Sequence, residues 1–404
     1  MSKTLFKNAL AIAIAGSLSA QAFAIDPQSI RLTDGIIFTP SLKVAESYND
    51  NFRAVNKNAE SSWITTLEPT FQLNADGRKS AYQLKYVASS DTFHSSHKDN
   101  NVDHHLTGDA GFEFNSRNRV VLSAGYHQVE DTASDNRNST FKSENDKYNT
   151  KNVGGVYTFG AEAARTQVEF GANYDELRYD NSKRYASGAR INSEKERDAT
   201  ALRSTVFYEI APKTKLLVEG RYTEYDYQNK NLGGRDKLDS KNKGALVGVT
   251  WDATAKTSGS FKIGRERKSF DSSDYDSKST GMWEAGVTWA PLTYSTFDLN
   301  TRQGFDEGDD GASAIKTQST RLGWKHYWLD RVYSNASYTR TDRKYQDIKR
   351  EDNIDDYGLS LTYEARRWLD VGIGYSYTDK NSSSGYKSEE YTRNIYALTF
   401  NASL

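Results

Sequence analysis

Charged side chains recur at every second position of many segments, with apolar side chains between them. In residues 216–222, for example, Leu216, Val218 and Tyr222 take even positions while Glu219 and Arg221 take odd ones. Successive side chains of a β-strand point to opposite faces, so the charged residues of such a segment share one face. The candidates found in this way are Lys85, Arg203, Arg221, Lys262, Arg302, Arg321, Lys325, Glu113, Glu169, Glu219, Glu266, Asp298 and Glu364.

Charges of both signs on one face predict a wet, polar surface, and two interpretations of it stay open. The charges pair across neighbouring strands and merely solvate a wall. Alternatively, together with tyrosines they form a polar track along which a hydrophilic polymer slides.

Metal chemistry is the second possibility to weigh. Four of the six histidines gather as His94, His97, His104 and His105, and imidazole suits zinc or copper. No scaffold or carboxylate spacing supports a site there, so we expect a solvated external loop. Residues 306–311, DEGDDG, partly resemble a calcium loop, but Thr317 stands where the twelfth-position glutamate belongs, and we expect a solvated turn. The sequence therefore predicts no metal site and no cofactor.

Catalytic motifs are missing from the sequence. His127 and His326 are isolated, and no nucleophile elbow, P-loop, HExxH or dinucleotide fingerprint occurs. We therefore predict that the protein is not an enzyme.

The C-terminal segment indicates which elements carry the alternating residues. Residues 391–404, YTRNIYALTFNASL, place apolar side chains at every second position up to the end. A strand of this kind shows an apolar face to one medium and a polar face to another, and both of its edges must be paired. A β-barrel closed around water and surrounded by lipid meets these conditions.

The same rhythm recurs along the chain as hairpins; in one of them, residues 357–363 and 371–377 are expected as strands joined by a short turn. Short turns alternate with polar loops of about 8 to 20 residues, such as residues 131–147 and 379–390, which is the asymmetry of outer-membrane barrels. We predict an all-β, antiparallel transmembrane barrel of about eighteen strands, with sixteen to twenty allowed. The last strand should pair with the first, near residues 36–48. Pro40 and Pro69 each remove a ladder N–H, and we expect a bulge or a shifted strand end at both.

The N-terminus predicts export. Residues 1–24 combine Lys3 and Lys7, a short apolar core and Ala22-Phe23-Ala24, the pattern of a secretory signal peptide. We divide the chain into this signal, a short periplasmic segment at 25–35 and the barrel at 36–404. The expected location is the cell outer membrane of a Gram-negative bacterium, where outer-membrane lipid and the barrel assembly machinery are the partners.

Composition narrows the remaining classes. The 53 basic residues, two of them in the signal, stand against 54 acidic ones, so the mature net charge of about −3 argues against a nucleic-acid partner. The absence of cysteine excludes disulfides and thiolate metal sites.

Residues 38–73, FTPSLKVAESYNDNFRAVNKNAESSWITTLEPTFQL, contain a strand, a Tyr-x-Asp-Asn element, a polar loop and an apolar strand with Pro69. This arrangement resembles the first hairpin of the putative β-barrel porin family found among exopolysaccharide and capsule biosynthesis proteins. The resemblance implies a barrel that assists export of a hydrophilic polysaccharide, for capsule or biofilm, beside a periplasmic polysaccharide-export protein. A general diffusion porin for small hydrophilic solutes is the alternative, and a soluble secreted β-protein is a third class.

Overall fold

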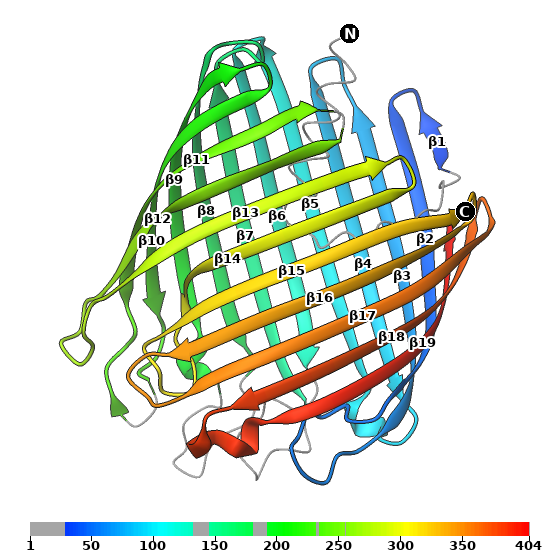
Figure 1. Cartoon of the computed structure of the whole chain (residues 1–404), viewed down its shortest axis with the longest axis vertical. Helices are drawn as coiled ribbons and strands as arrows, with labels where there is room; N and C mark the ends of the chain where they lie inside the picture. The colour runs from blue at the N-terminus through cyan, green and yellow to red at the C-terminus, as the bar shows by residue number, and fades with distance from the viewer. Residues whose placement is uncertain (1–28, 132–144, 181–191, 232–233, 255, 404) are drawn as a thin grey trace.

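A single antiparallel barrel forms the protein (Figure 1). The computed structural model describes residues 29–131, 145–180, 192–231, 234–254 and 256–403, and in these residues eighteen long strands close into the barrel. The strands are β2 (Ile36–Asn49), β3 (Ser62–Asp76), β4 (Ser80–Phe93), β5 (Asn101–Asn115), β6 (Asn118–Asp131), β7 (Asp146–Phe159), β8 (Thr166–Tyr179), β9 (Arg197–Ala211), β10 (Thr214–Tyr227), β11 (Ser240–Thr254), β12 (Thr257–Phe270), β13 (Lys278–Leu292), β14 (Ser295–Glu307), β15 (Ala314–Leu329), β16 (Val332–Tyr345), β17 (Glu351–Arg366), β18 (Leu369–Ser382) and β19 (Tyr391–Ser403). The predicted fold class and strand number are confirmed.

The barrel closes between its last and first long strands, as predicted. Strand β19 pairs with β2 from Ile395 opposite Asn49 to Ser403 opposite Ser41. At one end of this seam, the backbone N–H and the side-chain amide of Asn394 each donate a 2.7 Å hydrogen bond to the Asp50 carboxylate. Every long strand therefore has a partner on both edges, and no edge faces lipid.

A short extra strand, β1 (Ile30–Thr33), continues the seam. It pairs with residues 36–38 of β2, on the edge that β19 leaves free beyond Ser41. Pro40 lies at this junction, where its carbonyl accepts a 3.2 Å hydrogen bond from the Ser403 hydroxyl, and Pro69 lies where the β3–β4 pairing is interrupted. The β2–β3 register runs through both prolines without a shift, so the expected bulges are absent from this ladder. The predicted signal peptide lies outside the described residues.

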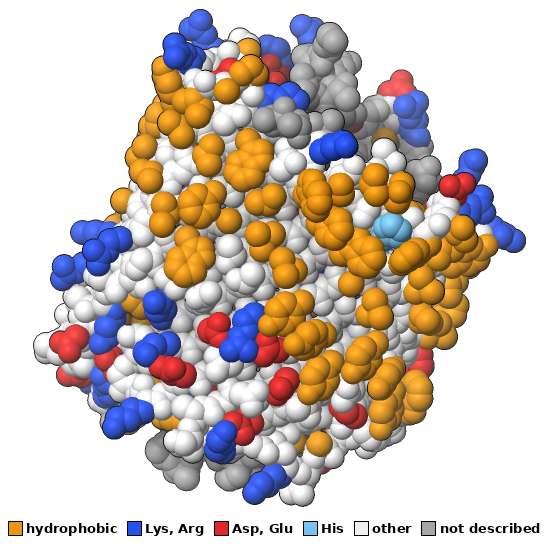
Figure 2. Space-filling model, viewed as in Figure 1, with side chains coloured by type: hydrophobic (Ala, Val, Ile, Leu, Met, Phe, Trp, Pro, Cys, Tyr) orange, Lys and Arg blue, Asp and Glu red, His pale blue; other side chains and the backbone are white. Residues whose placement is uncertain are grey.

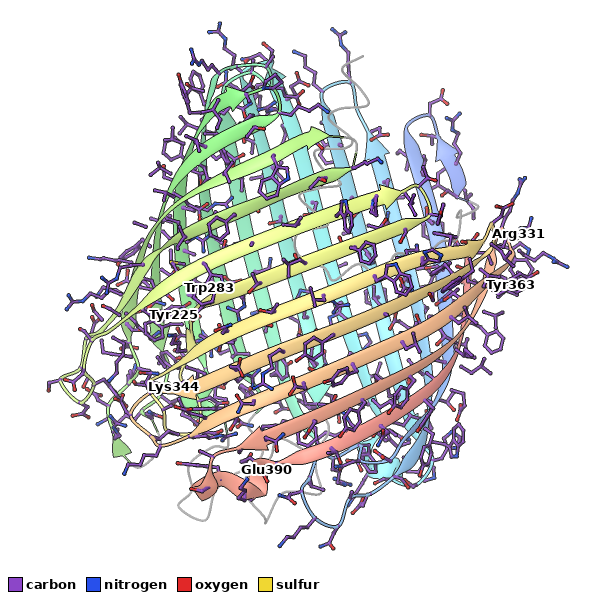
Figure 3. The ribbon with its side chains drawn as sticks, in the orientation of Figure 1. Tyr225, Trp283, Arg331, Lys344, Tyr363 and Glu390 are labelled. Atoms are coloured by element: carbon purple, nitrogen blue, oxygen red, sulfur yellow. The ribbon has the colours of Figure 1, made fainter. Side chains whose placement is uncertain are left out.

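The two ends of the barrel differ as the hairpin pattern predicts. Short turns join β3 to β4 and β15 to β16 at one end, and longer connections join β2 to β3 and β18 to β19 at the other. In Figure 3, Arg331 and Tyr363 lie at the turn end, whereas Lys344 and Glu390 lie at the loop end. The strands reach further toward the loops than the sequence indicated: residues 357–363 were expected as a strand, and β17 spans Glu351–Arg366.

Apolar side chains cover much of the outer surface. Figure 2 shows them gathered over the central and turn-side parts of the strands, with charged side chains mostly toward the loop end. Trp289, Trp328 and Trp368 are exposed beside short turns, as expected for an interfacial aromatic girdle. Among the described residues, no helix is both long and apolar enough to span a membrane.

The wall bends sharply at β11–β14, where β12 and β14 come into contact across β13. Glycines on the inner face permit this bend. A Cβ atom at Gly264 would lie 1.9 Å from the carbonyl oxygen of Ala245, and one at Gly248 would lie 2.3 Å from that of Phe261. Only glycine permits such a close backbone approach within a strand. The bend brings together inner-face side chains from strands that are not neighbours.

Candidate functional site in the barrel lumen

Four charged side chains meet on the inner face at this bend, and we call them the corner cluster: Glu219 and Arg221 of β10, Lys262 of β12 and Glu284 of β13. The Arg221 guanidinium donates to both carboxylate oxygens of Glu284, at 2.5 and 2.8 Å. The Lys262 ammonium lies 2.8 Å from Glu284 Oε2 and 3.4 Å from Glu219 Oε2. Arg221 also donates to Glu219, so the two positive and two negative groups form one closed network.

Strand register explains why these residues meet. Arg221 lies opposite Gly244 of β11, and Lys262 lies opposite both Gly248 of β11 and Glu284 of β13. Because neither glycine has a side chain, Arg221 reaches over β11 to the strands beyond it.

Apolar side chains pack beside the corner cluster on the same inner face. Leu246, Leu217 and Met282 are almost fully buried, and Glu219 is only 3% exposed. Water is therefore largely excluded from this carboxylate. A buried charge that is deprived of its partner is costly, so each member of the network depends on the others.

The remaining predicted residues lie on the same face but do not join the corner cluster. Glu266 accepts a 2.5 Å hydrogen bond from the Phe305 backbone N–H, and Asp298 accepts one of 2.7 Å from Thr288. Arg302 pairs with Asp306 at 3.1 Å. The Lys325 ammonium lies 4.3 Å from the centre of the Tyr333 ring.

Several predicted residues make few contacts. Glu169 lies 3.5 Å from the Thr158 hydroxyl. Glu113 lies opposite Arg119, and Glu364 lies opposite Asp370. Lys85, Arg203 and Arg321 form no ion pair with any residue that the structure describes. Their outward neighbours Leu84, Leu202 and Leu322 are about half exposed, which places these cations on the inner face. That they line a conducting pore stays a prediction.

Glu284 was missed in the sequence, although the alternation that selected the others would also have found it. It lies between Trp283 and Ala285 on the polar face of its strand. The first interpretation of the charged face was that its charges pair across neighbouring strands. It describes the corner cluster, but it does not describe Lys85, Arg203 and Arg321, which are unpaired among the described residues.

The four histidines that the sequence places together do not form one loop in the structure. His104 bonds to the Tyr86 hydroxyl at 2.8 Å, and His94 Nε2 lies 2.8 Å from the Thr65 hydroxyl. His97 begins a short 3₁₀ helix (His97–Asp99), and His105 lies on β5 opposite His127 of β6. Within the described ranges, no three His, Cys, Asp or Glu side chains come close enough to hold a metal ion together.

The expectation of a solvated turn at residues 306–311 is wrong in part. The side chain of Asp310 is 7% exposed and pairs with Arg350 at 2.6 Å, and Asp309 pairs with Lys195 at 3.3 Å. These partners come from other loops, which the sequence could not assign to this turn. The carboxylates thus link the loop between β14 and β15 to its neighbours.

A second link between loops involves Asp347, which accepts hydrogen bonds from Lys278 and Ser313. Burial acts to raise the pKa of Asp347, but the hydrogen bonds from Lys278 and Ser313 and the lysine charge outweigh it and hold the pKa below its ordinary value.

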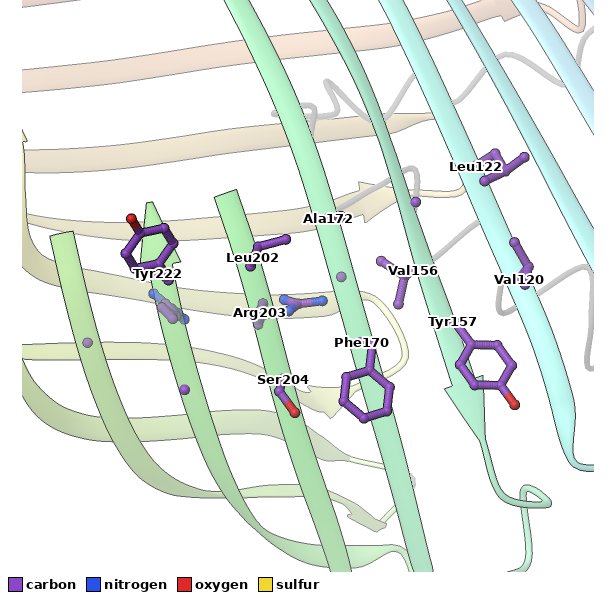
Figure 4. A pocket seen from close by; sticks show the side chains of 15 residues that line it. Val120, Leu122, Val156, Tyr157, Phe170, Ala172, Leu202, Arg203, Ser204 and Tyr222 are labelled. Carbon is purple, nitrogen blue, oxygen red and sulfur yellow. The ribbon is translucent and has the colours of Figure 1, made fainter. Parts of the chain in front are cut away.

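On the opposite, outer face, an apolar groove of about 640 Å³ crosses strands β6–β10 (Figure 4). Leu122, Tyr157, Phe170, Leu202 and Tyr222 border it. The small outward residues Gly155, Ala172, Ser204 and Gly220 give the groove its depth. Since it belongs to the outer surface, it is separate from the charged inner face.

Comparisons with known proteins agree with a barrel of this kind. The family model described as "Putative beta-barrel porin 2" matches residues 25–403. This confirms the predicted porin family in its general form, and the description does not mention polysaccharide. No curated protein gives a significant match to the sequence.

Solved structures of outer-membrane barrels are similar in fold at low identity. The FrpB iron transporter from Neisseria meningitidis is 11% identical, with a TM-score of 0.47, and the match covers 85% of this chain and 62% of FrpB. The siderophore receptor PirA from Pseudomonas aeruginosa is 12% identical (TM-score 0.46; 93% and 81% covered), and OpdO from Pseudomonas aeruginosa is 11% identical (TM-score 0.47; 91% and 97% covered). The chain thus spans less than two thirds of FrpB.

Proposed function

Because the chain belongs to the family described as "Putative beta-barrel porin 2", we propose that its barrel conducts small hydrophilic solutes through the outer membrane. The observation that carries this proposal is the division of the wall into an apolar outer face and an inner face with charges of both signs. Arg302 and Arg321 are exposed on that inner face, so they are available to water and to solutes. A barrel of this size is wide enough for an aqueous channel.

Liposome swelling tests the proposal. Vesicles that contain the folded barrel should swell in isotonic solutions of small sugars, at rates that fall as the sugar grows. Vesicles with heat-denatured protein provide the control. Folded barrels that admit neither sugars nor ions would contradict a diffusion channel.

Export of a polysaccharide is a second, finer proposal. It is supported by the resemblance of residues 38–73 and by aromatic pairs on the inner face. The rings of Tyr148 and Tyr179 lie 5.4 Å apart at the loop end, and those of Tyr327 and Tyr333 lie 5.1 Å apart at the turn end. Tyr333 is buried, so Tyr148, Tyr179 and Tyr327 supply the aromatic surfaces that an extended hydrophilic polymer would contact, and a periplasmic polysaccharide-export protein would deliver that polymer.

Deletion of the gene separates the two proposals. Loss of surface polysaccharide, restored by the wild-type gene, is expected if the barrel exports the polymer. If capsule and biofilm matrix are unchanged while uptake of small solutes slows, the export proposal fails and the diffusion channel stands.

A further inference from the structure

Two histidines that are far apart in the sequence face each other across neighbouring strands. His105 of β5 and His127 of β6 are directly opposite in the register. Their Nδ1 atoms lie 2.9 Å apart and form a hydrogen bond, in which one Nδ1–H donates to the other Nδ1, and their ring centres are 5.1 Å apart. The separation of 22 residues explains why the sequence did not bring them together.

Both imidazoles lie on the inner face of the barrel. Their sequence neighbours Leu106 and Tyr126 are exposed on the outer face, and alternation places His105 and His127 on the opposite one. Both histidines are partly exposed, and they lie a few residues from the loop end of their strands. Ions in the lumen can therefore reach them.

The hydrogen-bonded distance between the two nitrogens is also one at which both can bind the same metal ion, once the shared proton has moved to an Nε2 atom. An imidazole nitrogen binds a first-row metal ion at about 2.0–2.1 Å. Two such bonds at a right angle place their nitrogens about 2.9 Å apart, whereas a tetrahedral angle requires about 3.3 Å. Right-angled ligand pairs occur in square-planar and octahedral sites, which Cu²⁺ and Ni²⁺ prefer.

We propose that His105 and His127 bind a divalent copper or nickel ion in the lumen, as neighbouring ligands through their Nδ1 atoms. No third His, Cys, Asp or Glu ligand stands close enough among the residues described, so water completes the coordination. Asp103 lies two residues from His105 on the same face, and its Oδ1 accepts a 2.9 Å hydrogen bond from the Glu130 backbone N–H. Its negative charge favours a cation nearby. This site goes beyond the proposed channel function.

Copper titration of the folded full-length barrel, prepared in detergent without a histidine tag, tests the proposal. We expect one Cu²⁺ site per barrel by calorimetry, with nitrogen splitting from two imidazoles in the electron paramagnetic resonance spectrum. His105→Gln and His127→Gln should each weaken binding at least tenfold. His104→Gln is the matched control, because His104 contacts Tyr86 on the other face, and it should bind as the wild type does.

The outcomes separate the site from its alternatives. Heat-modifiable migration on gels verifies that each variant is folded, and the wild-type spectrum tests the proposal even if a variant does not fold. Wild-type affinity in both His105→Gln and His127→Gln would overturn the proposal and assign binding to the loop histidines His94 and His97. A spectrum with a single imidazole nitrogen would also overturn it.

Discussion

Arg221 holds two carboxylates that would otherwise repel each other. It pairs with Glu219 of its own strand β10, which is almost fully buried. It also pairs with Glu284 of β13, three strands away along the wall. Lys262 contacts the same two carboxylates but reaches Glu219 only at 3.4 Å. The corner cluster therefore depends most strongly on the guanidinium.

Removing this guanidinium should destabilise the barrel. Arg221→Met keeps an apolar stem but leaves buried Glu219 with only Lys262 and the Thr205 hydroxyl as partners, and we expect a loss of about 1.5–3 kcal/mol in the free energy of unfolding. Arg321→Met is the control: Arg321 is exposed and has no ion pair within the described residues, so a change within about 0.5 kcal/mol is expected. Denaturant titration followed by tryptophan fluorescence measures both values. Equal effects would contradict this account of the cluster.

Asp347 makes the loop end sensitive to acid. Its pKa in the folded protein lies below that of an unfolded chain, so its contribution to stability is present above the unfolded pKa of about 3.9 and is lost as the pH falls through the folded pKa. After correction for the pH dependence of the intrinsic exchange rate, the hydrogen-exchange protection of residues 307–314 and 345–351 should therefore be high at pH 5 and lower at pH 3. Asp347→Asn should already exchange faster at pH 5, and unchanged protection in this variant would refute the role of Asp347.

At the scale of the strands, glycine placement decides the shape of the wall. The inner-face glycines of β11 and β12 allow the bend that assembles the corner cluster, whereas Gly220 of β10 faces open space on the outside. Glycine content alone does not distinguish these roles, because each depends on which backbone lies opposite.

The bend should not tolerate a Cβ atom at position 264, where the backbones of β11 and β12 come closest. Gly264→Ala forces a methyl group against the Ala245 carbonyl, and we expect most of the protein to fail to reach the heat-modifiable folded form. Gly220→Ala adds the same methyl group where nothing lies within 4 Å, and it should fold like the wild type. The folded fraction on unheated gels compares the two variants. Normal folding of Gly264→Ala would show that the bend is not limited by this contact.

The closing strand gives a second prediction at this scale. Deletion of residues 396–404 removes most of β19 and leaves one edge of β2 unpaired along residues 41–48, and an open edge cannot face lipid. We expect the barrel assembly machinery to leave the truncated chain uninserted and open to proteolysis. Asn401→Ala, which keeps the strand, serves as the control. Normal outer-membrane levels of the truncated protein would refute the prediction.

At the scale of the whole molecule, the inner face combines both signs of charge, while the outer face is apolar over the middle of the barrel. In the corner cluster the charges neutralise one another, and the predicted lumen residues include nearly equal numbers of acids and bases. A channel of this kind has little net field to favour one sign of ion.

Weak ion selectivity is therefore expected. In a planar bilayer with a tenfold potassium chloride gradient, the reversal potential of the folded barrel should stay close to zero. A potential near the full value for a perfectly selective channel would show that unpaired cations such as Arg203, or unpaired acids, dominate the pathway. Measurement in Arg203→Ala would identify the contribution of that residue.

Much of the fold could be read from the sequence because a lipid-facing strand imposes a period of two on its residues. That period predicted the barrel, the strand number and the pairing of β19 with β2, and it selected Glu219, Arg221 and Lys262 for one face. It did not predict the strand extensions toward the loops, such as residues 351–356 of β17, because outside the lipid the alternation is no longer required.

The tertiary structure alone decided which of these side chains meet. Arg221 reaches Glu284 only because glycines bend the wall between their strands, and His105 meets His127 only because of the register of β5 and β6. Periodicity is a property of one strand facing two media, so a sequence shows it directly. Contacts between strands depend on register, curvature and the absence of intervening side chains, which are set by the closed barrel as a whole.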